Sequence, residues 1–234
     1  MKKTFIIACL LFACGVTFGQ IAEKQTYLSD FKEEMKKKWP TNRTLNIVFH
    51  GHSVPSGYFH GGVVNTMQAY PHLTFHGIKA QYPFTVLNVI TTSIGGEQAE
   101  QGEKRFSDEV LTHRPDVLFI DYALNDRSIG LERSEKAWRK MIEKALEQNI
   151  KIVLLTPTPD LKEDITDANA PLEAHAEMIR RLASEYHVGL VDSYLLFQKK
   201  AKEDEEIKRY MSQNNHPNSA GHACVAAEIL TWFF

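Results

Sequence analysis

Five short apolar runs, rich in β-branched residues, recur along the chain and are separated by longer segments with helical patterns. They cover residues 45–49, 85–91, 116–122, 151–156 and 188–191. Because each run is almost continuously apolar, we expect strands that are covered on both faces. Strands of this kind belong to a parallel sheet that lies between two layers of helices.

The intervening segments supply the helices. We expect helices over residues 63–80, 98–113, 132–148, 171–186 and 220–233. The clearest pattern is in 132–148, where an apolar stripe follows the 3.6-residue period. Strands that alternate with helices pair in parallel through right-handed crossovers. The fold predicted is therefore α/β, a three-layer α/β/α sandwich with a central, mostly five-stranded parallel sheet.

The first 20 residues differ from the rest of the chain. Lys2 and Lys3 precede an apolar stretch that runs to Phe18, and small residues follow. This pattern predicts a secretory signal peptide over residues 1–20, cut after Gly19 or Gln20, and hence an exported, periplasmic or secreted protein. The stretch is shorter than the ~20 residues that a membrane span needs.

Two details refine this prediction. The run Leu11-Phe12-Ala13-Cys14 weakly resembles a bacterial lipoprotein cleavage box, so lipid attachment at Cys14 is the alternative to simple cleavage. After the signal peptide we expect an N-terminal helical extension over residues 21–44 and one main domain over residues 45–234.

Charge and cysteine content narrow the class of protein. Residues 1–20 hold two lysines and no acid, so their removal shifts the formal net charge from −2 to −4. A mildly acidic protein is a poor candidate for binding nucleic acid. Cys224 is the only cysteine after residue 20, so the mature chain has no internal disulfide and depends on a packed core.

A serine and a histidine lie near opposite ends of the main domain. Ser53 follows the first apolar run by a few residues, and His216 precedes the last predicted helix. A serine hydroxyl is a poor nucleophile unless a base, usually histidine, lies within hydrogen-bond reach. Ligands of an open α/β sheet bind at the carboxyl ends of the strands, so the predicted fold can bring the two side chains together there.

Two further loops at the same edge carry groups that can bind an oxyanion. Adjacent glycines in Gly95-Gly96 let backbone N–H groups face a substrate. Asn125 follows the third run, where its amide can donate to a developing negative charge. Asn125 and Asp126 can equally cap a helix, and both roles are compatible if Asp126 holds the loop.

In this order, the four loops resemble those of the SGNH hydrolases, the GDSL esterases and lipases. Gly51-His52-Ser53 takes the place of the Gly-Asp-Ser block, Gly96 matches the glycine block, Ala123-Leu124-Asn125-Asp126 matches Gly-x-Asn-Asp, and His216-Pro217-Asn218 matches the histidine block. The resemblance extends over about residues 45–230 and implies the flavodoxin-like SGNH fold.

The resemblance also implies an activity, serine-dependent ester hydrolysis without a cofactor or metal. Ser53 would be the nucleophile and His216 the general base. The Ser53 N–H, the Gly96 N–H and the Asn125 side chain would form the oxyanion hole. The substrate would be a small-molecule or carbohydrate ester.

The chain departs from the family pattern at three positions. His52 replaces an aspartate and Ala123 a glycine, and neither is the reacting group. The third departure is Gln213, which occupies the position of the aspartate that usually orients the histidine, and loss of that carboxylate can cost roughly 10⁴ in turnover. Three alternatives remain. Gln213 or a backbone carbonyl can orient the histidine of a Ser-His dyad, or another acid, with Asp192 the first candidate, can take the place of the aspartate. In the third alternative, activity is much reduced.

Two other kinds of site are disfavoured. Histidines cluster between residues 50 and 76, but residues 50 and 52 of an extended segment point to opposite faces, so we expect no metal. The Gly-x-Ser-x-Gly nucleophile elbow of α/β-hydrolases is absent.

Three functions remain open at this point. The first is an exported serine esterase that removes acetyl or other short acyl groups from a carbohydrate. The second is a non-catalytic or weakly active carbohydrate-binding protein on the same fold, and the third is a phospholipid or lipid esterase. The mature chain is not expected to span a membrane.

Overall fold

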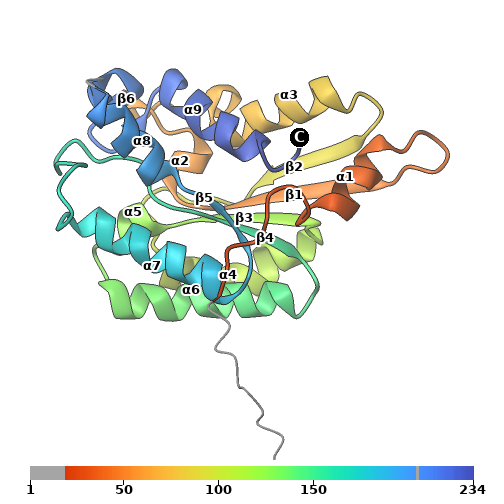
Figure 1. The fold of residues 1–234 in the computed structure, drawn as a ribbon, viewed down its shortest axis with the longest axis horizontal. Helices are drawn as coiled ribbons and strands as arrows, with labels where there is room; N and C mark the ends of the chain where they lie inside the picture. Colours follow the sequence, from red (N-terminus) through yellow and green to blue (C-terminus); the bar gives the residue numbers. More distant parts are fainter. Residues whose placement is uncertain (1–18, 204–205) are drawn as a thin grey trace, which may run out of the picture.

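A computed structural model of the protein describes residues 19–203 and 206–234. Five parallel strands form one sheet in the order β2-β1-β3-β4-β5 (Figure 1). The strands are β1 (Thr44–Gly51), β2 (Val86–Thr91), β3 (Val117–Asp121), β4 (Lys151–Leu155) and β5 (Gly189–Val191). The predicted α/β sandwich is thus confirmed. Most of the predicted signal peptide, residues 1–18 with Cys14, lies outside the described residues.

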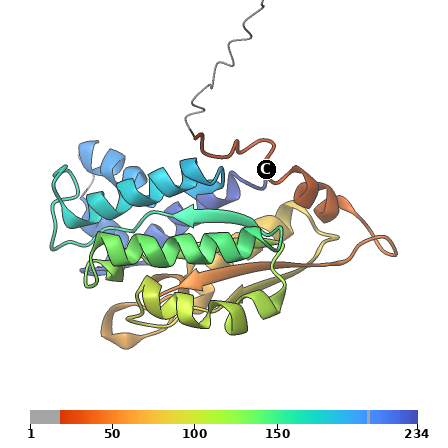
Figure 2. The ribbon, with the colours of Figure 1, turned by 90° about the horizontal axis from the view of Figure 1, so that it is seen from below.

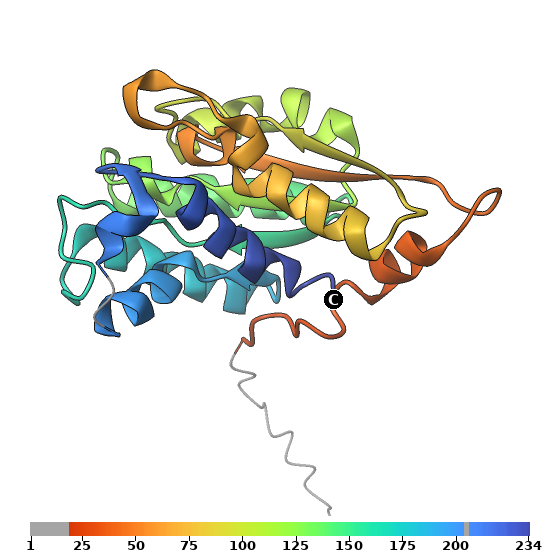
Figure 3. The ribbon, with the colours of Figure 1, turned by 90° about the horizontal axis from the view of Figure 1, so that it is seen from above.

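Helices cover the two faces of the sheet. One layer contains α4 (Ala99–Glu109), α6 (Leu131–Leu146) and α7 (Pro171–Glu185), seen in front of the sheet in Figure 2. The opposite layer contains α1 (Ser29–Lys36), α3 (Tyr70–Gln81), α8 (Ser193–Lys202) and α9 (Ser219–Leu230), and α3 and α9 lie side by side in Figure 3. None of the helices that the structure describes combines the length and apolar character needed to cross a membrane.

Short elements occupy the loops. They are the helical turns α2 (Ser53–Ser56) and α5 (Ala123–Asp126), the 3₁₀ turns His60–Gly62, Thr66–Gln68, Leu111–His113 and Ile207–Tyr210, and the antiparallel pair β6 (Met211–Gln213) and β7 (His216–Pro217). In Figure 1, α2, α5 and β6 all lie at the left end of the molecule, where the parallel strands end.

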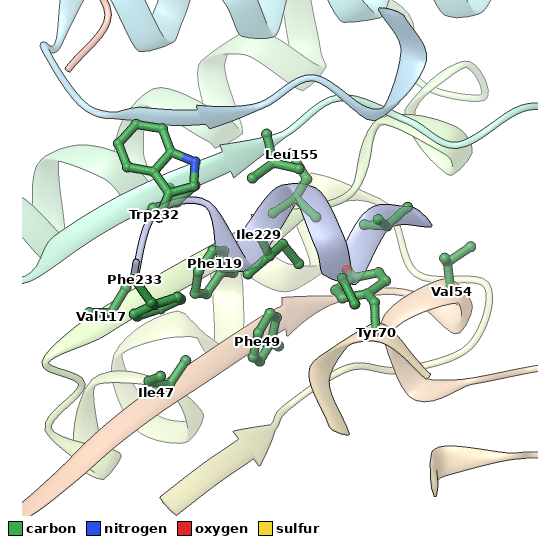
Figure 4. Close-up of a cluster of buried hydrophobic side chains, with 14 of the residues drawn as sticks. Ile47, Phe49, Val54, Tyr70, Val117, Phe119, Leu155, Ile229, Trp232 and Phe233 are labelled. Carbon is green, nitrogen blue, oxygen red and sulfur yellow. The ribbon is translucent and has the colours of Figure 1, made fainter. Parts of the chain in front are cut away.

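Apolar side chains fill the space on each side of the sheet. On the α9 side, the rings of Phe49 and Phe119 stack with centroids 4.5 Å apart, and Phe233 packs against Phe119 (Figure 4). On the other side, Trp138 is fully buried among α4, α6 and the strands. These clusters fix the strands, and therefore the loops that follow them.

Three sequence-based expectations need correction. The edge strand β2 is not covered on both faces, since Val86 is 47% exposed. The helix expected over residues 63–80 begins only at Tyr70, because the backbone is extended at Val63 and at Ala69 and forms only a short 3₁₀ turn between them. Helix α8 was not predicted at all.

The predicted extension, residues 21–44, contains α1. Phe31 and Met35 of this helix are buried in the same apolar cluster as α9. Residues 21–44 therefore pack against the sheet domain.

Candidate active site

Ser53 lies at the carboxyl edge of the sheet, at the start of α2 and two residues after β1. The backbone of β1 lies close to that of β3 just before the serine, so a side chain at Gly51 would clash with the carbonyl oxygen of Asp121 on the neighbouring strand. Only glycine fits at this point. Glycine therefore lets the end of β1 pack closely against the backbone of β3, just before the helical turn that presents the serine.

The structure brings Ser53 and His216 together. Ser53 Oγ and His216 Nε2 are 2.7 Å apart, and both residues are buried, with 7% and 9% exposure. This distance is within the range for direct proton transfer between a nucleophile and its base. The two predicted residues thus form a hydrogen-bonded dyad, although they lie near opposite ends of the domain in sequence.

The position of His216 is set by the β6–β7 hairpin. Its two strands pair Gln213 directly with His216, leaving Asn214 and Asn215 as the turn. Asn218 then caps α9, since its Oδ1 accepts hydrogen bonds from the N–H groups of Ala220 and Gly221. The hairpin and the cap together fix the imidazole at the head of α9.

Because the two residues pair across the hairpin, the side chain of Gln213 contacts Nδ1 of His216 through its amide nitrogen. Which atom of the Gln213 amide faces Nδ1, the nitrogen or the oxygen, determines the tautomer of the His216 ring. An amide N–H at Nδ1 requires the ring proton on Nε2, whereas the amide oxygen, exchanged in by a half-turn of the group, holds the proton on Nδ1 and frees Nε2 to accept from Ser53. Gln213 can therefore support the dyad, but it does not enforce the active tautomer as a carboxylate would.

Asp192, the alternative orienting acid, has other partners. Its carboxylate accepts hydrogen bonds from Arg180 Nε at 2.7 Å and Thr156 Oγ1 at 2.9 Å, and it caps α8 through the N–H of Leu195. Within the described part of the chain it makes no contact with His216. The structure therefore does not support Asp192 in the orienting role, since it brings Gln213 to that position.

Burial, together with the neighbouring His52, lowers the pKa of His216 to about 4, against an opposing effect of the Asp160 carboxylate. A lowered pKa keeps the ring neutral, and so able to accept a proton, throughout the neutral pH range. It also makes the ring a weaker base than one supported by a directly bonded carboxylate.

Two of the three predicted oxyanion groups lie in loops that are joined to each other, and the third, the Ser53 N–H, lies at the start of α2. Asn125 Nδ2 donates to the carbonyl oxygen of Glu97 at 2.9 Å, which links the start of α5 to the Gly95-Gly96 turn. Gly96 has φ +78° and is exposed, so its backbone conformation favours glycine and its N–H is accessible. Among the described residues the Gly96 N–H has no hydrogen-bond partner. The second amide hydrogen of Asn125 likewise remains available to a ligand.

Asp126 anchors the asparagine loop, as the sequence suggested. The carboxylate is fully buried and accepts hydrogen bonds from Ala99 N, Ser134 Oγ and Trp138 Nε1 at 2.6–2.8 Å. Through these bonds the residue next to Asn125 is tied to the start of α4 and to α6. The asparagine is therefore held on a rigid support.

A second buried network, which sequence reasoning missed, holds the glycine loop. Arg105 on α4 pairs with both oxygens of Glu97 at 2.6 and 2.8 Å and donates to the carbonyl oxygen of Thr92 at 2.6 Å. Tyr122 donates to the same carboxylate at 2.7 Å. The residues lie on separate elements, and nothing in their spacing along the chain indicates that they meet.

His52, the residue in place of the family aspartate, is also built into the site. Its Nδ1 accepts the N–H of Val54 at 3.2 Å and lies 3.5 Å from Ser53 Oγ, while its Nε2 faces Asp121 Oδ1 at 3.4 Å. Asp121 in turn accepts a hydrogen bond from Tyr70 at 2.8 Å. His52 therefore caps α2 and lies beside the nucleophile, with a buried carboxylate behind it.

Tyr58 forms one wall of the site. Its ring lies over that of His216, with centroids 6.2 Å apart, and a side chain at Gly95 would come within 3.1 Å of it. The backbone of Tyr58 is held by hydrogen bonding to Ser53 O and by a β-bridge to Val64. The space beside Ser53 is thus narrowed by an aromatic ring.

No group of three or more histidine, cysteine, aspartate or glutamate side chains within residues 19–203 and 206–234 is placed to hold a metal ion. His50, one of the histidines considered for such a site, instead lies 2.9 Å from Thr92 Oγ1 and 3.1 Å from the hydroxyl of Tyr122.

Comparison with known proteins agrees with this geometry. A model of the GDSL-like lipase/acylhydrolase family matches residues 49–224. The chain belongs to this family. It is accordingly a hydrolase that acts on ester bonds. No curated protein matches the chain in sequence.

Several solved structures share the fold. The acetylxylan esterase Axe2 from Geobacillus stearothermophilus has a TM-score of 0.70 at 19% identity, over 81% of this chain and 94% of that one. The acetyl xylan esterase AlAXEase has a TM-score of 0.66 at 22% identity, over 79% and 98%.

A two-domain esterase active on acetylated mannans, co-crystallised with mannopentaose, has a TM-score of 0.74 at 21% identity over 92% of this chain. This chain spans only 54% of that protein's length. At these identities the similarity establishes the fold.

Proposed function

We propose that the protein is an exported esterase that removes acetyl or other short acyl groups from a carbohydrate. The observation that carries the proposal is the 2.7 Å contact between Ser53 Oγ and His216 Nε2. The Gly96 N–H and the second amide hydrogen of Asn125, in loops at the same edge of the sheet, supply the further donors that the reaction needs. Export is proposed from the signal-like sequence of residues 1–20.

The reaction proceeds in two halves. Ser53 Oγ bonds to the ester carbonyl carbon as His216 Nε2 takes its proton, and the carbonyl oxygen becomes an oxyanion that the backbone and Asn125 donors stabilise. The carbon–oxygen bond to the alcohol then breaks, and the alcohol leaves with the proton from His216. Water repeats the sequence on the acyl-enzyme, which releases the acid and restores Ser53.

Two observations support a short acyl group and a sugar. Tyr58, packed between His216 and Gly95, restricts the space beside the nucleophile. The solved structures with the same fold include esterases whose substrates are acetylated xylan and acetylated mannan. Because their sequence identity to this chain is only about 20%, these structures support the proposed substrate class without establishing it.

The test compares purified wild-type protein with Ser53→Ala. We expect the wild type, and not the variant, to release acetate from acetylated xylo- or manno-oligosaccharides. Equal acetate release by the two proteins would refute the proposal.

One feature favours a second candidate, an esterase for longer apolar acyl chains. Val63 and Met67, between α2 and α3, and Ile94, in the loop after β2, are 48–60% exposed. A series of p-nitrophenyl esters separates the candidates. Rates that fall steadily beyond acetate and propionate support the sugar deacetylase, whereas a maximum at eight or more carbons, raised further by micelles, supports the lipid esterase.

A further inference from the structure

A polar depression opens beside the catalytic histidine. Its volume is about 450 Å³, within the ~300–1,000 Å³ usual for small-ligand pockets. It is lined by His60, Asp160, Lys162, Gln213, Asn214 and Asn215, and we call it the amide pocket. Gln213 also contacts His216, so the pocket lies directly next to the catalytic dyad.

Three loops at the carboxyl edge of the sheet form the pocket, and hydrogen bonds connect two of them. The N–H of Leu161 donates to the carbonyl oxygen of Asn214 at 2.7 Å, which joins the loop after β4 to the β6–β7 turn. Asp160 is 94% buried, and its carboxylate accepts from Arg127 at 2.7 Å and from the N–H of Lys162 at 3.0 Å. The frame of the pocket is therefore fixed by the protein itself.

The side chains that face this frame are unpaired. Within the described part of the chain, those of His60, Lys162, Asn214 and Asn215 have no hydrogen-bond or ion-pair partner. Two amides, an ammonium and an imidazole offer several donors and acceptors at short range. Groups of this kind match the closely spaced hydroxyls of a saccharide.

The charges around the pocket balance. Arg127 pairs with Asp160 and with Glu163, so these three groups carry one net negative charge, and Lys162 offsets it. A neutral ligand therefore suits the pocket better than an anion does.

The reaction chemistry places the alcohol part of the ester on the same side. The leaving oxygen takes its proton from His216 Nε2, so the alcohol must lie next to His216. The carbonyl oxygen lies on the opposite side, toward Gly96 and Asn125. The amide pocket adjoins His216 through Gln213 and is thus on the alcohol side.

We propose that the amide pocket binds the neutral sugar that carries the ester, with Lys162 and Asn215 donating to its hydroxyls. This inference rests on the proposed function and adds where the sugar lies and which residues hold it. Each neutral hydrogen bond to the sugar contributes about three- to tenfold in affinity.

The test measures a specificity ratio, which is kcat/KM for an acetylated xylo- or manno-oligosaccharide divided by kcat/KM for p-nitrophenyl acetate. We expect Asn215→Ala and Lys162→Met each to lower this ratio several-fold, mainly through KM for the saccharide. The double variant should lower it at least tenfold. Lys136→Met, an exposed lysine on α6, is the matched control and should leave the ratio unchanged.

Two results would overturn the assignment. One is an unchanged kcat/KM for both substrates in the double variant of an enzyme whose wild type hydrolyses the saccharide. The other is an equal loss of kcat/KM on both substrates, which would show that the two side chains support the dyad and do not bind the sugar. A wild type that cleaves p-nitrophenyl acetate but no acetylated saccharide would instead refute the proposed function, and the pocket's role with it.

Discussion

The substitution Gln213→Glu tests most directly how the residue beside His216 controls the protonation of its ring. Glutamate has the length of glutamine, and both of its carboxylate oxygens are acceptors. Placed against His216 Nδ1, it keeps the ring proton on that nitrogen, so Nε2 always faces Ser53 as an acceptor. The substitution therefore removes the tautomer ambiguity of the amide and adds the missing negative charge.

The size of the effect follows from the contact. A full charge about 3 Å from the imidazolium contributes ~5 kcal/mol at an effective dielectric constant of about 20, and Gln213 is only half-buried, so solvent screens part of it. A neighbouring opposite charge favours the protonated ring, so we expect the pKa of His216 to rise from about 4 to ~5–7.

The sign of the pH effect is definite. The base works unprotonated, so activity is lost as the pH falls through the pKa of His216, which is about 4 in the wild type. Raising that pKa moves the acid limb of the kcat/KM profile to higher pH. At pH 8 we expect about ten- to a hundredfold higher kcat, a part of the ~10⁴ that an orienting acid can provide.

The assay is the pH dependence of kcat/KM for p-nitrophenyl acetate in the wild type and in Gln213→Glu. Gln148→Glu adds the same charge at an exposed residue after α6, at the opposite edge of the sheet, and should leave the profile unchanged. An acid limb at the same pH in all three proteins would refute the reasoning.

Three further predictions concern the oxyanion hole, its support and acid stability. Asn125→Ala should lower kcat by about 10²–10³ in steady-state assays with p-nitrophenyl acetate while KM changes little, and an unchanged kcat would exclude the amide from the oxyanion hole. Asp126→Asn turns an amide N–H toward one of three buried donors and should cost more than about 2 kcal/mol of unfolding free energy, measured by urea titration; full stability would contradict the anchoring role. Burial lowers the pKa of both His50 and His222 to about 3, so the unfolded chain binds more protons below pH 6.5, and the unfolding free energy should fall by up to ~1.4 kcal/mol per pH unit for each histidine as the pH drops toward 3. A urea midpoint that stays constant between pH 6.5 and 4 would show that these rings are not buried in their neutral form.

The sheet could be predicted from sequence because its inner strands are buried almost continuously and are therefore mostly apolar. The runs at 45–49 and 151–156 match β1 and β4 within a few residues. The segment 63–80 does not form a single helix because Val63 and Met67, although apolar, are exposed in a loop whose backbone is extended at Val63 and Ala69. Apolar character alone does not reveal whether a side chain is buried.

Helix α8 was missed for a different reason. From the sequence, Asp192 is a possible orienting acid for His216, whereas in the structure its side chain caps this helix and pairs with Arg180. An aspartate directly before a helical segment is a capping signal. The sequence therefore does contain a signal for the start of α8, at Asp192.

The site residues could be found because each follows a strand or precedes α9, and the sheet brings such positions to one edge. The supporting contacts could not be found in the same way. The Arg105–Glu97 pair and the His52–Asp121 pair join side chains from separate elements, and their meeting depends on helix placement and side-chain direction. Only the three-dimensional structure supplies that information.

The central claim is that His216 activates the hydroxyl of Ser53. Labelling with a fluorophosphonate, followed by peptide mass spectrometry and timed quenching, tests it directly. We expect a single adduct on Ser53 that forms rapidly in the wild type and at least a hundredfold more slowly in His216→Gln. An adduct on another residue, or labelling of Ser53 at the same rate in both proteins, would contradict the claim.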